Sequence, residues 1–242
     1  RRLYRSARPR FYVLATTTGP TMVDGAAHFA DGPGHHLHRS DRDLMADKET
    51  LSIYAAQFAK YEELDMSRTQ IDSIIAFLAR LAPGASILDL GCGPGAHAEM
   101  MLKQGFDVHA TDATPEFVNV AKAKGVNARV ATFDDLTEVA AYDAIWASFS
   151  LLHAPKVDMP HHLAAISRAL KPDDWFFLGT KLGTGESRDS IGRFYAYYSE
   201  TELTDLLSTA GFEIADTYVG EEAGLSGETA PFILIHARRF HG

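Results

Sequence analysis

A glycine-rich turn between a short apolar segment and a helical one constrains the fold of this chain most. Residues 86–100 read SILDLGCGPGAHAEM, a pattern that predicts a buried strand, a sharp turn and the start of a helix. Glycine suits such a turn because the backbone must bend sharply and approach a ligand closely. Gly91, Gly93 and Ala96 fit the dinucleotide spacing G-x-G-x-x-G/A, whereas Gly91, Gly93 and Gly95, with Asp89 ahead of them, fit D-x-G-x-G-x-G. The turn therefore predicts a nucleotide-like ligand and leaves its identity open.

Strand and helix patterns alternate along the chain around this turn. We expect helices over residues 49–64, 67–82, 96–104, 114–125, 159–172 and 199–211. Ser67 is an expected N-cap, and Ser199 with Glu202 forms an expected capping box. We expect strands over residues 86–90, 106–112, 127–133, 142–148, 174–182, 212–220 and 231–240. This alternation predicts an α/β fold, a seven-stranded, mostly parallel sheet with helices on both faces. The last two strands lie too close in sequence for a helix between them, so they are expected to form a C-terminal antiparallel hairpin.

The composition of the chain limits its function. Of the 242 residues, 46% are hydrophobic and the net charge is -9, which fits a globular protein and argues against a nonspecific nucleic-acid or membrane binder. No apolar run approaches the roughly 18 residues of a membrane-spanning helix. The single cysteine, Cys92, precludes an internal disulfide and fits a reducing compartment. We expect a cytoplasmic monomer or homodimer that binds neither nucleic acid nor membrane.

The first 44 residues differ from the rest. They open with RRLYRSARPR and continue rich in Gly, His and Asp, with little periodicity, so we expect a flexible N-terminal extension before a domain over residues 45–242. MADKET, from Met45, resembles a natural start, and an organelle transit segment is the alternative for the arginine-rich stretch. His35, His36 and His38 have no partner ligands at a metal-binding spacing, so no metal site is expected.

Three features decide between the two turn patterns. Pro94 and Gly95 make the turn broader than one that grips a pyrophosphate. The carboxylate of Asp89 would repel a pyrophosphate but can help to hold a positively charged ligand such as S-adenosylmethionine, which carries a sulfonium and an ammonium and no phosphate. The predicted terminal hairpin replaces the second half of a dinucleotide-binding fold. Asp112, about 20 residues after Gly91 at the end of the second strand, suits ribose hydroxyls in either case.

The ordered motifs carry a family resemblance. The segments ILDLGCGPGAHAEML, VHATDATPEFVNVAKA, FDDL, YDAIWASFSLLHAP and ISRALKPDDWFFLGT follow one another in this order. They resemble the successive motifs of class I S-adenosylmethionine-dependent methyltransferases, over roughly residues 50–240. The stretch from Gly183 to Phe212 is similar to a bacterial small-molecule subgroup, methyltransferase type 11/12 or tellurite-resistance-like. The resemblance implies a Rossmann-like fold and methyl transfer from S-adenosylmethionine to an unidentified small molecule. A NAD-dependent oxidoreductase and a cofactor-binding protein without transfer activity are the alternatives.

The resemblance also implies which residues hold the cofactor. The methionine part would meet Asp89, Gly91, Cys92, Gly93 and Gly95. The adenosine part would meet Asp112 at the ribose, Ala113 beside the adenine, Phe133 and Asp134 around its amino edge, and Ala147 and Ser148 beneath it. This chain has Phe-Asp-Asp where the family often has Gly-Asp-Ala, so Asp135 is an alternative to Asp134. Structural alternatives are a core role for Phe133 and a helix-capping role for Asp112, the latter disfavoured by the competing cap Thr114.

The acceptor is expected near three further segments. His153, after the fourth strand, is a candidate general base because its ordinary pKa lies near about 6.5; a wall or structural role is the alternative. The stretch 183–198 is expected to be a substrate lid, in which Arg193 grips an anion and Tyr195, Tyr197 and Tyr198 shape the pocket. Pairing among Glu186, Arg188 and Asp189 is the alternative for its charges. Tyr54 and Tyr61 on the first helix are further candidate substrate residues, on a helix expected to fold over the cofactor; core packing is the alternative.

Overall fold

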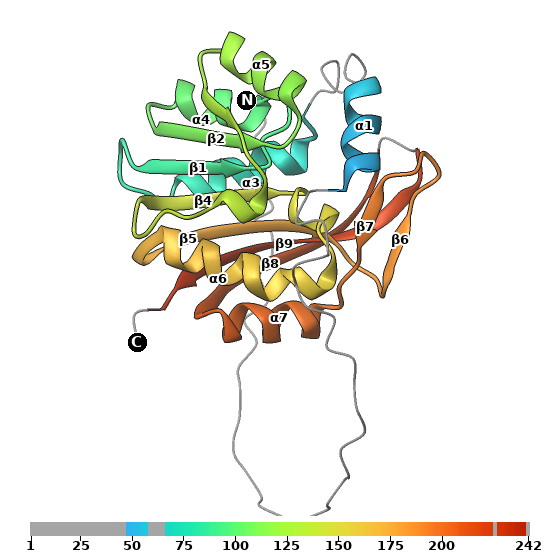
Figure 1. Cartoon of the computed structure of the whole chain (residues 1–242). Coiled ribbons are helices and arrows are strands. Elements are labelled where there is room, and N and C mark those ends of the chain that lie inside the picture. Colours follow the sequence, from blue (N-terminus) through green and yellow to red (C-terminus); the bar gives the residue numbers. More distant parts are fainter. Residues whose placement is uncertain (1–46, 58–65, 225–226, 241–242) are drawn as a thin grey trace, which may run out of the picture. The chain divides into compact units, whose positions relative to one another are not determined.

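The computed structural model describes residues 47–57, 66–224 and 227–240 (Figure 1). All of these residues belong to one unit of the chain, Met45–Gly242. The expected flexible extension over residues 1–44, its histidine cluster and Tyr61 therefore lie outside the described residues. Within the described part of the chain, no helix has both the length and the apolar character needed to cross a membrane.

A seven-stranded sheet forms the centre of the unit, with the strand order β3-β2-β1-β4-β5-β9-β8. The first five strands run parallel, and β9 and β8 are antiparallel neighbours at one edge. Their bounds are β1 Ser86–Leu90, β2 Asp107–Asp112, β3 Asn127–Val130, β4 Tyr142–Ser148, β5 Leu170–Lys181, β8 Phe212–Ala223 and β9 Thr229–Arg239. This topology confirms the predicted Rossmann-like α/β fold with a C-terminal antiparallel hairpin.

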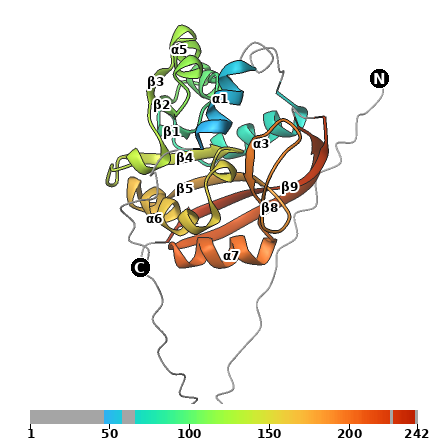
Figure 2. The ribbon, with the colours of Figure 1, turned by 45° about the vertical axis from the view of Figure 1, so that its right-hand side comes forward.

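Helices cover both faces of this sheet (Figures 1 and 2). One core cluster joins the sheet to α3 (Arg68–Leu78), α4 (Ala96–Lys103) and α5 (Pro115–Ala123). The other joins it to α6 (Met159–Ala169) and α7 (Glu200–Thr209). Side chains along β4 alternate between the two clusters, because successive residues of a strand point to opposite faces. Ala144 and Trp146 pack with α3, and Ile145 and Ala147 pack with α6.

Helix termini follow the predicted caps at most positions. Ser67 and Ser199 both form complete capping boxes, with Gln70 and Glu202. Thr114 occupies the N-cap position of α5 but makes no side-chain capping bond. The carboxylate of Asp112 instead accepts the backbone N–H of Thr114 at 2.8 Å. Part of the capping role expected of Thr114 thus falls to Asp112.

Several boundaries differ from the prediction. α3 ends at Leu78, and α1 is described over Lys48–Ala56, with residues 58–65 outside the described part. The strand at 127–133 ends at Val130, and a 3-10 helix, η1, follows over Phe133–Asp135. β8 and β9 both extend into the connection expected between residues 220 and 231. An antiparallel ladder pairs the backbone N–H and C=O groups there, whatever the polarity of the exposed side chains.

The expected lid segment contains a small two-stranded sheet. β6 (Glu186–Arg188) pairs antiparallel with β7 (Phe194–Ala196). Asp189 holds the turn between them, because its side chain accepts the backbone N–H groups of Ile191 and Arg193. We refer to residues 186–196 as the β6–β7 hairpin.

Candidate active site

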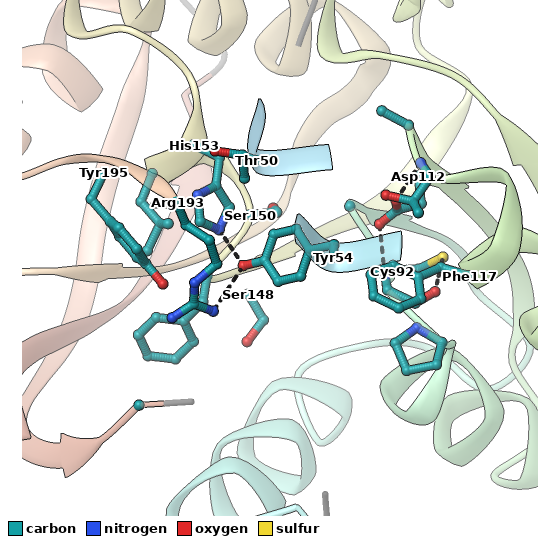
Figure 3. Close-up of a pocket in the computed structure, with 18 of the residues that line it drawn as sticks. Thr50, Tyr54, Cys92, Asp112, Phe117, Ser148, Ser150, His153, Arg193 and Tyr195 are labelled. Atoms are coloured by element: carbon teal, nitrogen blue, oxygen red, sulfur yellow. Dashed lines mark hydrogen bonds between the residues drawn. The ribbon is translucent and has the colours of Figure 1, made fainter. Parts of the chain in front are cut away.

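A pocket of about 380 Å³ lies at the carboxyl ends of the parallel strands, where ligands bind in open α/β sheets. It brings together residues predicted for the cofactor and for the acceptor. Those on its wall are Tyr54, Gly91, Cys92, Gly93, Asp112, Ala113, Phe133, Ser148, His153, Arg193 and Tyr195. Tyr54 lies in the middle of Figure 3, between His153, Arg193 and Tyr195 on one side and Asp112, Cys92 and Phe117 on the other. We refer to these sides as the acceptor end and the cofactor end.

The turn after β1 presents backbone to the cofactor end. The N–H groups of Gly91 and Cys92 both donate to the carbonyl of Thr111, at 2.8 and 2.9 Å. Gly91 has φ +79°, and a Cβ added there would lie 2.3 Å from the Cβ of Ser150. At Gly93, with φ +53°, an added Cβ would meet nothing within 4 Å. Gly91 is therefore required for packing, whereas Gly93 exposes bare backbone toward the pocket.

Gly95 has a different role from the one predicted. It is absent from the pocket wall, and its added Cβ would lie 2.7 Å from the Cβ of Ala121. The residue allows α4 to approach α5 closely. It supports the cofactor end through this packing and does not line it.

Asp89 also lies away from the wall. Its side chain is 1% exposed, and the backbone N–H of Ala98 donates to its carboxylate. Its Oδ2 has no hydrogen-bond partner among the described residues. Burial, and then the charge of Asp112, raise the pKa of Asp89 to about 8. A carboxyl group that is largely neutral at pH 7 offers little attraction to a cationic ligand, so the predicted electrostatic role of Asp89 does not fit this geometry.

Asp112 occupies the predicted position at the end of β2. Its Oδ2 accepts the N–H of Gly93 and its Oδ1 accepts the N–H of Thr114, both at 2.8 Å. Burial raises the pKa of this carboxyl, although both hydrogen bonds oppose the shift. Each carboxylate oxygen has more than one acceptor site, so the group can hold the glycine turn and still accept hydrogen bonds from ribose hydroxyls.

The expected adenine edge is only partly as predicted. Phe133 lines the pocket with Ala131 and Thr132. Asp134 faces α6 instead, 3.7 Å from His161 and 3.9 Å from His162. Asp135 accepts the backbone N–H of Thr132 in a capping box. Neither carboxylate reaches the wall, because the 3-10 turn directs both side chains away from it.

Strand alternation separates two further predicted residues. Ser148 lines the pocket, whereas Ala147 is fully buried in the core cluster with α6. The prediction that both lie under the cofactor is therefore wrong for Ala147, since adjacent residues of β4 point to opposite faces.

His153 lies at the acceptor end with both ring nitrogens engaged. Its Nδ1 lies 2.7 Å from the carbonyl of Phe194, and its Nε2 lies 2.6 Å from the hydroxyl of Tyr54. A carbonyl only accepts, so Nδ1 carries the proton and Nε2 accepts from Tyr54. Burial lowers the pKa of His153 to about 4, with a further contribution from the charge of Arg193. The imidazole is therefore neutral at pH 7 and a weaker base than a solvent-exposed histidine, and its Nε2 lone pair accepts from Tyr54.

Arg193 is an internal ion-pair partner rather than an open anion clamp. Its guanidinium donates to Oδ2 of Asp189 from Nε at 2.9 Å and from Nη2 at 2.7 Å. The two side chains are 2% and 3% exposed. Nη1 also donates to the hydroxyl of Tyr54 at 3.3 Å. The predicted grip on an anionic acceptor does not fit, because Asp189 already neutralises this cation. Arg188 pairs with Asp47 and Glu49, and Glu186 accepts the N–H of Lys156. The alternative, pairing among Glu186, Arg188 and Asp189, therefore does not hold either.

The three tyrosines of the segment point in different directions. Tyr195 lines the pocket, with its ring centroid 4.8 Å from that of His153. Tyr197 packs beside Gly183, and Tyr198 is buried in the core cluster with α7. Neither lies on the pocket wall. Alternation along β7 and the bend after it account for the difference.

Sequence reasoning missed several wall residues, among them Thr50, Phe117, Phe149, Ser150 and Lys181. The hydroxyl of Thr50 accepts the N–H of Phe194 at 2.8 Å, which joins α1 to the β6–β7 hairpin. Phe149 has φ +53°, a sparsely populated conformation for a bulky residue. Lys181, at the carboxyl end of β5, could have been found from its strand position alone. Among the described residues, no group of three or more His, Cys, Asp and Glu is placed to hold a metal ion.

Comparison with known proteins identifies the family to which the chain belongs. A family model described as a methyltransferase domain matches residues 61–217, more than half of the chain. The chain belongs to this methyltransferase family. The match confirms the predicted family and enzyme class, a methyltransferase with S-adenosylmethionine as its cofactor.

Individual relatives agree at the level of sequence. A ubiquinone biosynthesis O-methyltransferase of Xanthomonas oryzae is 37% identical over 105 residues, which cover 40% of this chain and 43% of that protein. A protein of the same name from Xylella fastidiosa is 35% identical over 105 residues, covering 40% and 42%. The chain thus matches less than half of the length of these curated relatives.

Solved structures share the fold. A 1,6-didemethyltoxoflavin-N1-methyltransferase of Burkholderia thailandensis, with bound 1,6-didemethyltoxoflavin and S-adenosylhomocysteine, superposes with a TM-score of 0.66. It is 23% identical, and the alignment covers 88% of this chain and 94% of that one. A SAM-dependent methyltransferase of Methanosarcina mazei gives a TM-score of 0.63 at 19% identity, covering 74% and 100%.

Proposed function

We propose that this protein transfers a methyl group from S-adenosylmethionine to a hydroxyl group of a small aromatic molecule. One observation carries the proposal: a single pocket joins the turn of Gly93 and Asp112 to a wall made by Tyr54, His153 and Tyr195. The O-methyltransferase names of the sequence relatives support a hydroxyl acceptor. The aromatic wall supports a flat, largely apolar acceptor.

The cofactor end offers groups that suit S-adenosylmethionine. Gly93 leaves room for a ligand against its backbone, and the Asp112 carboxylate faces the same space. Ala113, Ala131 and Phe133 supply an apolar surface for a base. The wall there is formed by backbone, small side chains and one carboxylate, which matches a ligand with hydroxyls and an aromatic base. Bound there, S-adenosylmethionine would supply an activated methyl group.

The acceptor end would hold and deprotonate the hydroxyl. The Tyr54 hydroxyl donates to the unprotonated Nε2 of His153, and the Phe194 carbonyl fixes the opposite nitrogen. A proton taken up at the Tyr54 oxygen can therefore pass to His153 as Tyr54 releases its own. Arg193 holds the Tyr54 oxygen in place from the other side. The main contribution of the pocket is orientation, which is worth up to roughly 7–11 kcal/mol when two reactants are well held.

Binding of S-adenosylhomocysteine, with Asp112→Ala as the variant, tests the cofactor end. We expect the wild-type protein to bind it in calorimetry and NADH not to bind. Asp112→Ala should lose about 10- to 100-fold in affinity, because hydrogen bonds to a charged group contribute roughly 1.5–3 kcal/mol. Asp107→Ala, at the exposed start of the same strand, is the matched control and should leave the affinity unchanged. Failure of the folded wild-type protein to bind S-adenosylhomocysteine at millimolar concentration would overturn the proposal.

Transfer itself needs a second measurement. Incubation with S-adenosylmethionine and a panel of phenols and catechols, read by mass spectrometry, should give a product heavier by one methylene. Tight binding of S-adenosylhomocysteine without any methylated product across the panel would favour a cofactor-binding protein without transfer activity.

A further inference from the structure

Lys181 is a cation at the acceptor end that the proposed reaction does not use. It is the last residue of β5, and its side chain lines the pocket. Its Nζ lies 4.4 Å from the centroid of the Tyr195 ring, within the range of a cation–π contact. Tyr195 in turn contacts His153, with ring centroids 4.8 Å apart. One aromatic ring therefore connects Lys181 to the Tyr54–His153 pair.

The two cations at this end of the pocket differ in how closely a carboxylate pairs with them. Arg193 is neutralised by Asp189 through two short hydrogen bonds. Lys181, in contrast, contacts the Tyr195 ring and forms no ion pair within 4.0 Å with any carboxylate of the described residues. Asp189 and Glu228 influence Lys181 only at longer range, while burial and the nearby Arg193 lower its pKa. A half-buried ammonium without a close counter-ion stabilises a negative charge brought next to it.

The surroundings of Lys181 also limit the kind of anion. Tyr195, Phe149 and Phe232 line the pocket with it, and Phe232 is its neighbour across the β5–β9 ladder, so one side of the ammonium is aromatic. Glu222 of β8 also lines this wall. One lysine offers a single positive charge and three donors, which match the single negative charge of a carboxylate. The anionic group must also belong to a molecule flat enough to lie among aromatic rings.

We infer that Lys181 binds the carboxylate of the methyl acceptor, and that the substrate class is aromatic hydroxy acids. This inference rests on the proposed methyl transfer, and it assigns to Lys181 the anion-binding role that Arg193 cannot fill. The carboxylate lies against Lys181, and the hydroxyl that accepts the methyl group points toward Tyr54 and His153. Lys181 is thus a specificity-determining residue.

Two probes that differ in charge alone test the inference. The protein is first saturated with S-adenosylhomocysteine, and 4-hydroxybenzoate or 4-hydroxybenzamide is then titrated by calorimetry. We expect the wild-type protein to bind the acid about 10- to 100-fold more tightly than the amide, as for a charge-assisted hydrogen bond. Lys181→Met, which keeps the apolar stem, should abolish this preference and leave the affinity for the amide unchanged. Lys181→Arg should retain it.

Lys156→Met is the matched control. Lys156 also lies over a tyrosine ring, with Nζ 4.7 Å from the centroid of Tyr198, but it pairs with Glu202 and is absent from the pocket wall. This variant should keep the full preference for the acid.

The outcomes separate the two proposals. If S-adenosylhomocysteine fails to bind wild-type protein, the proposed function fails. If S-adenosylhomocysteine binds but the acid shows no advantage over the amide, the inference about Lys181 is overturned and the proposed function stands. The same holds if neither the acid nor the amide binds. A preference that survives in Lys181→Met overturns it as well, because the anion then binds elsewhere. The affinity of each variant for S-adenosylhomocysteine shows that the variant is folded.

Discussion

The two ends of the pocket are built in different ways. The cofactor end is formed by backbone N–H groups and one carboxylate. The hydrogen bond from Gly93 to Asp112 there joins residues 19 positions apart. At the acceptor end, side chains from distant segments form a buried network. Tyr54 meets His153 across 99 positions and Arg193 across 139. The first arrangement depends on local backbone conformation, and the second depends on charges and hydroxyls that satisfy one another only in the complete fold.

The ion pair of Asp189 and Arg193 offers the strongest way to break the acceptor end. Asp189→Ala leaves a buried guanidinium without its counter-ion, and removal of one partner of a buried pair costs about 3–5 kcal/mol. We expect a loss of this size in the free energy of unfolding, measured by urea denaturation. If the two ends are independent, the remaining folded protein should bind S-adenosylhomocysteine with unchanged affinity.

Arg188→Ala is the control for that experiment. Arg188 pairs with Asp47 and Glu49 on the surface, and its side chain is 38% exposed. Exposed pairs contribute about 0–1 kcal/mol, so this variant should unfold almost as the wild type does. A loss of less than about 1 kcal/mol in Asp189→Ala would show that the buried network is dispensable, against the contrast drawn above.

The turn after β1 gives the reciprocal test at the cofactor end. In Gly91→Ala, the new methyl group meets Ser150 in a backbone conformation that disfavours side chains. Left-handed strain of about 1–2 kcal/mol and overpacking of about 1–3 kcal/mol together predict a destabilisation of about 2–5 kcal/mol. We also expect binding of S-adenosylhomocysteine to be lost in calorimetry, because the displaced turn carries Gly93.

Gly84→Ala separates strain from packing. Gly84 has φ +75°, close to that of Gly91, but an added Cβ meets nothing within 4 Å. Only the conformational cost of about 1–2 kcal/mol should remain, and cofactor affinity should be intact. Equal effects of the two substitutions would mean that the contact with Ser150 is not what demands glycine at position 91.

The contrast also explains what the sequence could predict. The strands at 86–90 and 142–148 match the prediction residue for residue, because apolar runs bounded by turn residues specify them locally. The positions of Gly93 and Asp112 in the pocket follow from the same local pattern. The fold class needs no more than the order of such elements.

The acceptor end was less predictable for physical reasons. Arg193 was expected to face an anionic ligand, but whether a cation is already neutralised depends on the turn that brings Asp189 back to it. Tyr195 and Tyr198 are the same type of residue in the same segment, yet Tyr195 lines the pocket and Tyr198 lies in the core. The same limit applies near the cofactor end to Asp89, which fits its motif but whose burial arises only when α4 packs over it. Partner choice, burial and side-chain direction are properties of the tertiary structure.

The smallest expected effects come from the removal of two buried tyrosine hydroxyls. The hydroxyl of Tyr54 donates to His153 and accepts from Arg193, whereas that of Tyr198 has no hydrogen-bond partner among the described residues. Tyr54→Phe should therefore cost about 0.5–1.5 kcal/mol of unfolding free energy, because it leaves Nε2 of His153 unpaired. Tyr198→Phe should be neutral or stabilising, because it removes a buried polar group that gains nothing from the fold. Both rings stay in place, so S-adenosylhomocysteine should bind each variant as it binds the wild type. Equal unfolding free energies for the two variants would mean that the bond between Tyr54 and His153 contributes nothing to stability, and the acceptor end would then owe its order to ring packing and to the Asp189–Arg193 pair.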